Sequence, residues 1–301
     1  AVLPHADVVL VVGSRFINGL TQPLYASPKT AFIYLNIEEA ATVAPRQAGT
    51  KLVADAHAGL DALADELGGW HAPSRADVVC RVKRWCNEQL AAIEPQLSWV
   101  RALREAIPDD GVLVNELTQV GYLATLAYPV FTPRSFITPG YQGTLGYGFP
   151  TALGVAAGNP GRTVVSINGD GGFGWNLQEL ATAAKYRLNL VTVVFADGAF
   201  GNVRRVQQRL FGRGMGAKLH NPDFCTLASA FGIHSERIAS PQALTGAIRE
   251  LSSLEGPVLL EVPVGEMPSP WHLIHSFSPA PQPPPPNPLG TVATDVAGGR
   301  I

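Results

Sequence analysis

Two aspartates that follow apolar runs could bind a divalent cation together. Asp170 follows the run Val164–Asn168 in a glycine-rich turn, and Asp197 follows a second run at 190–196 in the same way. The spacing of 27 residues leaves room for one helix, so both carboxylates are expected at the carboxyl edge of one parallel sheet. Two carboxylates, backbone carbonyls and water form the oxygen site that Mg²⁺ prefers. The alternative is that the two Asp-Gly pairs only form turns.

Glycines accompany both aspartates, namely Gly169, Gly171, Gly172, Gly198 and Gly201. Glycines let backbone N–H groups approach a ligand closely, and a helix expected to begin near Asn176 would add the positive end of its dipole. A metal ion together with backbone N–H donors suits a diphosphate. The sequence therefore predicts a site for magnesium and a diphosphate group at these turns.

The elements that must position these turns alternate along the chain. Strands are predicted at 111–115, 163–168, 190–196 and 257–263, and helices near 148–158, 176–187, 223–231 and 241–252. A long helix is predicted over 76–106 from its apolar spacing and few breakers. This alternation indicates an α/β fold with a doubly wound parallel sheet.

The N-terminal region has a smaller pattern of the same kind. Apolar strands are predicted at 7–12, 31–38 and 51–55, with a helix over 56–67. They suit part of a Rossmann-like middle domain, whose missing half would precede this chain or come from another; alternatively, the strands extend the second domain. We therefore expect a partial middle domain at 1–68, a linker at 69–84 and the diphosphate domain at 85–272.

Residues 273–301 form a proline-rich tail, with seven prolines between Pro279 and Pro288. Such a composition predicts extended, disordered chain, with folding over the active site as the alternative.

Composition excludes several classes of protein. The chain of 301 residues is 46% apolar and 15% charged, which provides for a large core. A net charge of −2 without a basic block argues against nucleic acid as a partner. No apolar run reaches the roughly 18–20 residues of a membrane helix, and no signal peptide is evident, so a cytoplasmic protein without membrane contact is expected. Cys80, Cys86 and Cys225 are expected to be free thiols.

Three segments give the chain a resemblance to a known family. They are Gly169–Phe173 with Asn176–Ala183, then Asp197–Val203, and the glycine-rich block Gly140–Gly154. Over roughly residues 5–270 the chain resembles the thiamin-diphosphate-dependent decarboxylase and carboligase superfamily, specifically the C-terminal portion of acetolactate synthase-like enzymes. The resemblance implies thiamin diphosphate and Mg²⁺ as cofactors.

The resemblance also implies roles for individual residues. Asp170, Asp197 and the backbone carbonyl of Ala199 take the positions of the metal ligands. The family has Asn-Asn where this chain has Ala196-Asp197, which adds one negative charge beside the diphosphate. Leu145 takes the position of the apolar wedge that bends the cofactor into a V shape, and the backbone carbonyl of Gly143 that of the contact to the aminopyrimidine. The other cofactor-binding candidates are Thr118, Gln119, Thr144, Gly169, Gly171, Gly172, Phe200, Gly201 and Asn202.

The resemblance implies chemistry on 2-oxo acids: attack of the cofactor on the carbonyl, loss of carbon dioxide, then protonation or addition to a second carbonyl. The glutamate that protonates the pyrimidine ring in these enzymes belongs to another domain, and neither Glu116 nor Glu179 is nominated in its place. This chain should therefore need a complementary chain with the pyrimidine-binding domain, within a homo- or hetero-oligomer, and should be inactive alone. Flavin binding stays open, because Asn36 and Glu38 replace the usual acidic pattern.

Two alternatives to this function remain. One is a non-catalytic, cofactor-binding or regulatory subunit, and the other an unrelated Mg²⁺-dependent phosphate-processing enzyme.

Several nearby residues allow two interpretations each. Arg204 and Arg205 could attract an acidic substrate or lie on a solvated helix face, and Trp175 could line the site or pack in the core. His220 precedes Asn-Pro-Asp, a pattern typical of a helix start.

Overall fold

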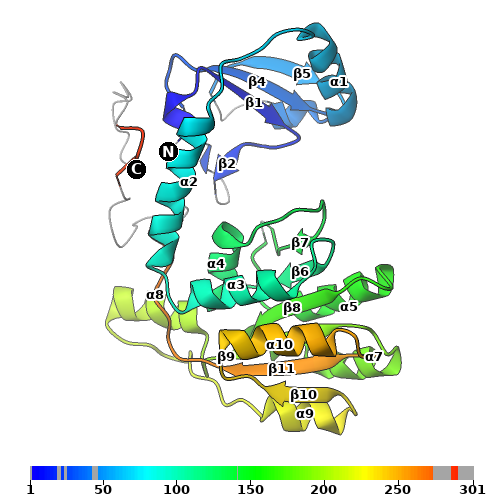
Figure 1. Ribbon diagram of the computed structural model, residues 1–301. Helices are drawn as coiled ribbons and strands as arrows, with labels where there is room; N and C mark the ends of the chain where they lie inside the picture. Colours follow the sequence, from blue (N-terminus) through cyan, green and yellow to red (C-terminus); the bar gives the residue numbers. More distant parts are fainter. Residues whose placement is uncertain are drawn as a thin grey trace. The chain divides into compact units, whose positions relative to one another are not determined.

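The computed structural model describes residues 2–18, 22–23, 26–42, 47–140, 142–273 and 286–290 (Figure 1). The chain divides into two compact units, one formed by Ala1–Gln89 with Trp271–Ile301 and the other by Leu90–Pro270. This boundary lies a few residues after the stretch 69–84 that the sequence predicts as a linker, and part of that stretch is helical, because helix α2 covers Ala76–Ala91. Most of the predicted tail at 273–301 lies outside the described residues.

The larger unit is built on a six-stranded parallel sheet with the strand order β10-β11-β9-β8-β6-β7. Its strands are β6 (Val112–Asn115), β7 (Phe136–Ile137), β8 (Val164–Gly169), β9 (Val191–Ala196), β10 (His234–Arg237) and β11 (Val258–Pro263). Its helices are α3 (Gln96–Ala106), α4 (Gln119–Ala127), α5 (Gly148–Gly158), α6 (Asp170–Phe173), α7 (Leu180–Lys185), α8 (Gly201–Phe211), α9 (Phe224–Ala230) and α10 (Pro241–Leu251), with a 3₁₀ turn at Leu177–Glu179. The predicted α/β class with a parallel sheet is confirmed.

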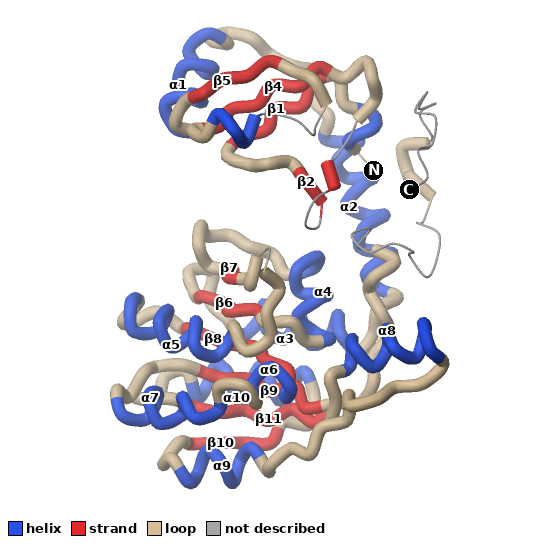
Figure 2. Tube along the Cα trace, turned by 180° about the vertical axis from the view of Figure 1, so that it is seen from behind, coloured by secondary structure: helices blue, strands red, loops and turns tan. Residues whose placement is uncertain are grey.

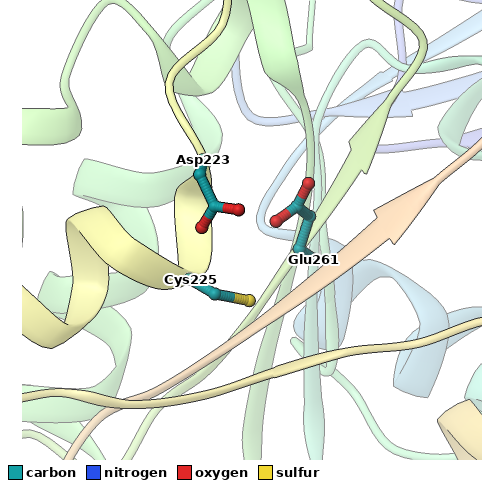
Figure 3. A group of neighbouring side chains, drawn as sticks. All are labelled: Asp223, Cys225 and Glu261. Carbon is teal, nitrogen blue, oxygen red and sulfur yellow. The ribbon is translucent and has the colours of Figure 1, made fainter.

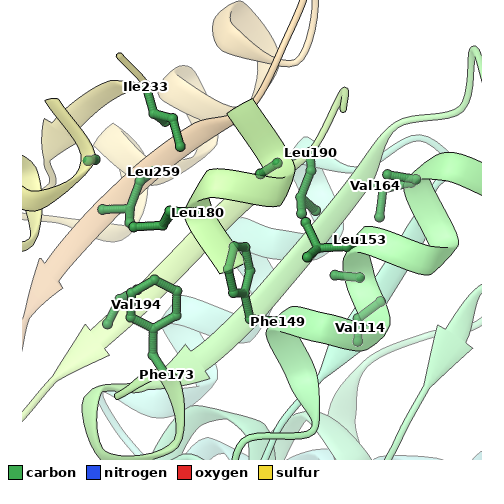
Figure 4. Packing of buried hydrophobic residues seen from close by; sticks show 14 of the residues in the cluster. Val114, Phe149, Leu153, Val164, Phe173, Leu180, Leu190, Val194, Ile233 and Leu259 are labelled. Carbon is green, nitrogen blue, oxygen red and sulfur yellow. The ribbon is translucent and has the colours of Figure 1, made fainter. Parts of the chain in front are cut away.

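Helices flank both faces of this sheet, as Figures 1 and 2 show from opposite sides. On one face, α5, α7 and α9 pack on the strands around Phe149 and Phe173, whose ring centroids are 5.1 Å apart (Figure 4). On the other face, Trp99 of α3 meets Phe195 of β9 at 5.6 Å. The central strands are therefore buried on both sides, which explains their unbroken apolar sequences.

The four strands predicted for this unit match β6, β8, β9 and β11 within one residue at each end, because fully buried strands leave clear apolar runs. β7 and β10 were not predicted: β7 has two residues, and β10 is largely exposed. The predicted helix over 76–106 is wrong in its middle, where 92–95 separate α2 from α3. Pro95 occupies the N-cap position of α3 and lacks the N–H that a continuous helix needs.

The smaller unit holds a three-stranded parallel sheet with the order β1-β4-β5. Its strands are β1 (Val8–Val12), β4 (Ala31–Asn36) and β5 (Thr50–Val53), followed by α1 (Ala56–Glu66), which Asp55 caps. The short elements are β2 (Ile17–Asn18), β3 (Gln22–Pro23) and 3₁₀ turns at Leu3–His5 and Glu39–Thr42. One side of the sheet packs Val11, Phe32 and Tyr34, whereas Val8 and Leu10 on the other side stay 57% and 43% exposed.

Among the described helices, none combines the length and the apolar composition needed to cross a membrane. The three cysteines are free thiols.

Candidate functional site

A cavity of about 300 Å³ lies at the carboxyl ends of β6, β8 and β9. Its lining is Leu117, Thr118, Gln119, Tyr122, Gly143, Leu145, Gly169, Asp170, Gly171, Gly172, Phe195, Asp197, Ala199, Phe200, Gly201, Asn202, Val203 and Val264. The lining therefore contains every predicted cofactor and metal residue except Thr144, which is exposed and does not contribute to it. Ligands of open parallel sheets bind at this edge.

Asp170 is fixed by three hydrogen bonds and is 3% exposed. Its Oδ1 accepts from the backbone N–H of Gly171 at 2.9 Å. Its Oδ2 accepts from the backbone N–H of Gly198 at 2.7 Å and from Asn221 Nδ2 at 2.6 Å. The carboxylate is thus held against the β9 turn without a cationic partner among the described residues.

Asp197 follows β9 and is held by hydrogen bonds from its own turn and from Gln119, which lies beyond the end of β6. Its Oδ1 accepts from the Ala199 N–H at 3.0 Å, and its Oδ2 accepts from Gln119 Nε2 at 2.7 Å. Burial and the negative charge of Asp170 raise the pKa of Asp197 to about 6. Both carboxylates line one cavity, and neither forms an ion pair with a described residue, so together they are a donor set that fits a divalent cation.

Gln119 lines the cavity, but its side chain is used within the protein. Its Nε2 also donates to the Gly265 carbonyl at 3.1 Å, and its Oε1 accepts from the Met267 N–H at 2.8 Å. Both ends of the amide are therefore used within the protein. Gln119 positions Asp197 against the segment after β11, and its side chain has no donor left over for a diphosphate.

Two helices of nine and eleven residues begin at the cavity. Thr118 is the N-cap residue of α4 and Phe200 that of α8, and neither side chain caps its helix. The first N–H groups of a helix have no partner within it, so they suit an anion. The helix predicted to begin near Asn176 is present as a 3₁₀ turn at Leu177–Glu179 that continues into α7, but none of its residues lines the cavity, which is bordered by α8 instead.

A turn formed by residues 143–146 supplies another side of the cavity. Gly143 and Gly146 have φ angles of +53° and +79°, a region that favours glycine. Leu145 is 37% exposed and lines the cavity. The Gly146 carbonyl accepts from Asn176 Nδ2 at 2.7 Å, so the side chain of Asn176 holds this turn and does not cap the 3₁₀ turn that follows it.

Arg204, Arg205 and Trp175 do not line the cavity. Arg204 and Arg205 pair with Glu266 at 3.1 and 3.8 Å, so they tie α8 to the segment after β11. Trp175 is 64% exposed, so it packs neither in the core nor against the cavity.

Asn221, one residue after His220, is a site residue that the sequence analysis missed. The helix-start pattern that follows His220 is confirmed by Asp223, which caps α9 through the Thr226 N–H at 2.7 Å. Asn221 precedes this cap by two residues and is 51 residues from Asp170, the residue it contacts. No local sequence pattern predicts a contact between residues this far apart in the chain.

A second acidic group lies elsewhere in this unit, formed by Asp223, Cys225 and Glu261, whose ligand atoms lie within 4.8 Å of one another (Figure 3). Arg237 donates to Asp223 at 2.6 Å and to Glu261 at 3.1 Å. Burial, followed by the Glu261 charge, raises the pKa of the Cys225 thiol. Because a guanidinium already pairs with both carboxylates and the raised pKa keeps the thiol protonated, this group does not suit a metal ion.

Comparison with known proteins agrees with this geometry. Residues 117–262 match the family described as thiamine pyrophosphate enzyme, C-terminal TPP binding domain. The acetolactate synthase isozyme 2 large subunit of Escherichia coli is 32% identical over 275 residues, covering 90% of this chain and 50% of that protein. A probable acetolactate synthase large subunit of Methanocaldococcus jannaschii is 30% identical over 278 residues, covering 86% of this chain and 46% of that protein.

Among solved structures, the Rhodococcus jostii RHA1 thiamine diphosphate-dependent 4-hydroxybenzoylformate decarboxylase superposes with a TM-score of 0.65 at 23% identity, covering 86% of this chain and 49% of that one. This likeness shows the fold. The chain spans about half the length of the relatives that it matches. The matches confirm the resemblance to the C-terminal portion of thiamin-diphosphate-dependent, acetolactate synthase-like enzymes.

Proposed function

We propose that this chain, whose residues 117–262 form a thiamin-diphosphate-binding domain of the acetolactate synthase-like type, is the diphosphate- and magnesium-binding portion of an enzyme that acts on 2-oxo acids. The observation that carries the proposal is one cavity. It joins the Asp170 and Asp197 carboxylates, the first N–H groups of α4 and α8, and the apolar side chain of Leu145.

Each of these groups would have a separate task. Asp170, Asp197 and the Ala199 carbonyl would hold Mg²⁺, while the N–H groups at the starts of α4 and α8 would bind the diphosphate. Leu145 and the Gly143 carbonyl would orient the aminopyrimidine end. Thiamin diphosphate, when bound, supplies the electron sink for cleaving the bond beside a 2-oxo acid's carbonyl. The protein's own contribution is binding, orientation and a partly closed cavity.

A complementary chain follows from what this cavity lacks. Glu116 has both carboxylate oxygens engaged by backbone N–H groups, and Glu179 accepts from Thr182 Oγ1 at 2.7 Å and does not line the cavity. Neither offers the carboxylate that the pyrimidine ring needs. We therefore propose that a pyrimidine-binding domain with this glutamate comes from another chain or segment, in a homo- or hetero-oligomer. A phosphate-processing enzyme with a lysine beside its aspartate is not supported, because the lining holds no lysine.

The test is native mass spectrometry of the purified protein with Mg²⁺ and thiamin diphosphate, followed by carbon dioxide release from pyruvate. The expected result is a complex that contains a second polypeptide and the cofactor, and that turns over. A complex that holds the cofactor without turnover would support a non-catalytic subunit. An oligomer of this chain alone that never retains the cofactor would contradict the proposal.

A further inference from the structure

Glu116 is a buried carboxyl group for which the proposed chemistry has no use. It directly follows β6, is 1% exposed, and does not line the cavity. No ion pair engages it within the described residues. Burying a charge or a polar group without partners is unfavourable, so its partners show what it is there to hold.

Those partners belong to the turn that presents Leu145. Glu116 Oε1 accepts from the Gly146 N–H at 2.7 Å, and Oε2 accepts from the Gly148 N–H at 3.1 Å. The Gly146 amide directly follows Leu145, and the Gly148 amide belongs to the first residue of α5. Together with the bond from Asn176 to the Gly146 carbonyl, they fix the peptide next to Leu145 from both sides.

The same carboxyl group also touches the helix that begins with Asp170. A Cβ at Gly172 would lie 1.9 Å from Glu116 Oε1, and one at Gly148 would lie 2.7 Å from Oε2 and 2.6 Å from Asn168 Oδ1. Gly172 therefore needs glycine because Glu116 fills the space, and Gly148 needs it because Glu116 and Asn168 do. One side chain thus packs between the turn of Leu145 and α6, two parts of the cavity wall that are distant in the sequence.

We propose that Glu116 is a positioning residue that sets the place of Leu145 and the Gly143 carbonyl relative to Asp170. The inference rests on the proposed function, because the task of Leu145 is defined by the cofactor. A displacement of about 1 Å in a group that orients reactants can cost about 100-fold in rate. Loss of the two bonds should therefore reduce turnover far more than it reduces cofactor affinity.

The experiment compares Glu116→Gln and Glu116→Ala with Glu179→Gln as the matched control. Hydrogen exchange of the Gly146 and Gly148 amides is measured first, since it needs neither cofactor nor partner. We expect these amides to exchange at least about tenfold faster in both Glu116 variants, with unchanged exchange in Glu179→Gln and in helix α3. Unchanged exchange at both amides would overturn the proposal. If Glu116→Ala fails to fold, Glu116→Gln decides, because it keeps one acceptor oxygen and the side-chain volume.

Turnover in the cofactor-loaded complex is the second measurement. We expect a loss of about 10- to 100-fold for Glu116→Gln, with the dissociation constant of thiamin diphosphate within about threefold of wild type. In a Leu145→Ala background, Glu116→Gln should cost less than about twofold more, because both act on the same contact. Fully additive losses would overturn the positioning role. If the wild-type protein never binds the cofactor, the proposed function is refuted instead. The hydrogen exchange of the Gly146 and Gly148 amides would still show whether Glu116 holds this turn.

Discussion

Two groups of carboxylates in the larger unit have similar composition and opposite electrostatics. Asp170 and Asp197 face a cavity without a cation, and burial together with the Asp170 charge raises the pKa of Asp197 to about 6. The pKa shift beside Arg237 has the opposite direction: the Thr226 N–H and the guanidinium lower the pKa of Asp223 to about 2. A cluster of acidic residues is therefore a candidate cation site only where the protein has not already supplied the cation.

The largest expected effect separates the two groups directly. Asp170→Asn should weaken Mg²⁺-dependent binding of thiamin diphosphate by at least about 100-fold, since loss of even an outer partner of a metal ligand costs about 10- to 100-fold. Asp223→Asn should change it by less than about twofold, because asparagine still caps α9. Titration calorimetry with and without Mg²⁺ measures both. Equal effects of the two substitutions would remove the distinction.

A smaller effect concerns the stability of the metal-free protein. With its pKa near 6, folded Asp197 binds more protons than the unfolded chain between about pH 4 and 6, so the free energy of unfolding should fall as pH rises through that window. Solvent in the open cavity screens the charges, which limits the fall to the order of 1 kcal/mol. Asp197→Asn should flatten this dependence.

The test is to measure the free energy of unfolding by denaturant, with a chelator present, at about pH 4 and about pH 6 for wild type and for Asp197→Asn. Burial also raises the pKa of Glu116, which adds a slope of the same sign to both proteins, so the difference between wild type and variant is what counts. Mg²⁺ should stabilise wild type more at the upper end than at the lower. A variant as steep as wild type would show that the repulsion between Asp170 and Asp197 is not the cause.

The same contrast shows what sequence can and cannot predict. Asp170 and Asp197 were predicted because each lies in a turn whose local composition carries the information, whereas the role of Leu145 came from the resemblance to the family. Asn221, Arg237 and the contacts of Gln119 were not, because their partners are between 14 and 148 residues away and meet only in the folded sheet. Glu116 was not nominated as the pyrimidine's partner, and only the fold shows its hydrogen bond with the Gly146 N–H.

The helix starts predicted at 148, 223 and 241 agree with α5, α9 and α10 within one residue, whereas those at the cavity were not predicted. The side chain of Asn176 is used by the Gly146 carbonyl, and the helices that begin at the cavity follow Thr118 and Phe200, whose side chains form no cap. A helix that begins without a side-chain cap leaves no local pattern in the sequence. At α4 and α8 the missing caps also leave backbone N–H groups available for a ligand, and such groups suit a diphosphate.

The smallest effect tests whether the Arg237 group is purely structural. Arg237→Gln leaves Glu261, which is 8% exposed, without its cation, so the unfolding midpoint should drop at neutral pH, and adding Glu261→Gln should recover part of the loss.

In wild type, Asp223 stabilises the fold above about pH 4, and this contribution is lost as pH falls toward 2. The variant should lose less in that acid window, since the pKa of Asp223 moves back toward its ordinary value. Its affinity for Mg²⁺ and thiamin diphosphate should stay within about twofold of wild type. A loss of affinity approaching that of Asp170→Asn would mean that the two carboxylate groups are coupled through β9 and β11, and that the Arg237 pairs support the site of Asp170 and Asp197.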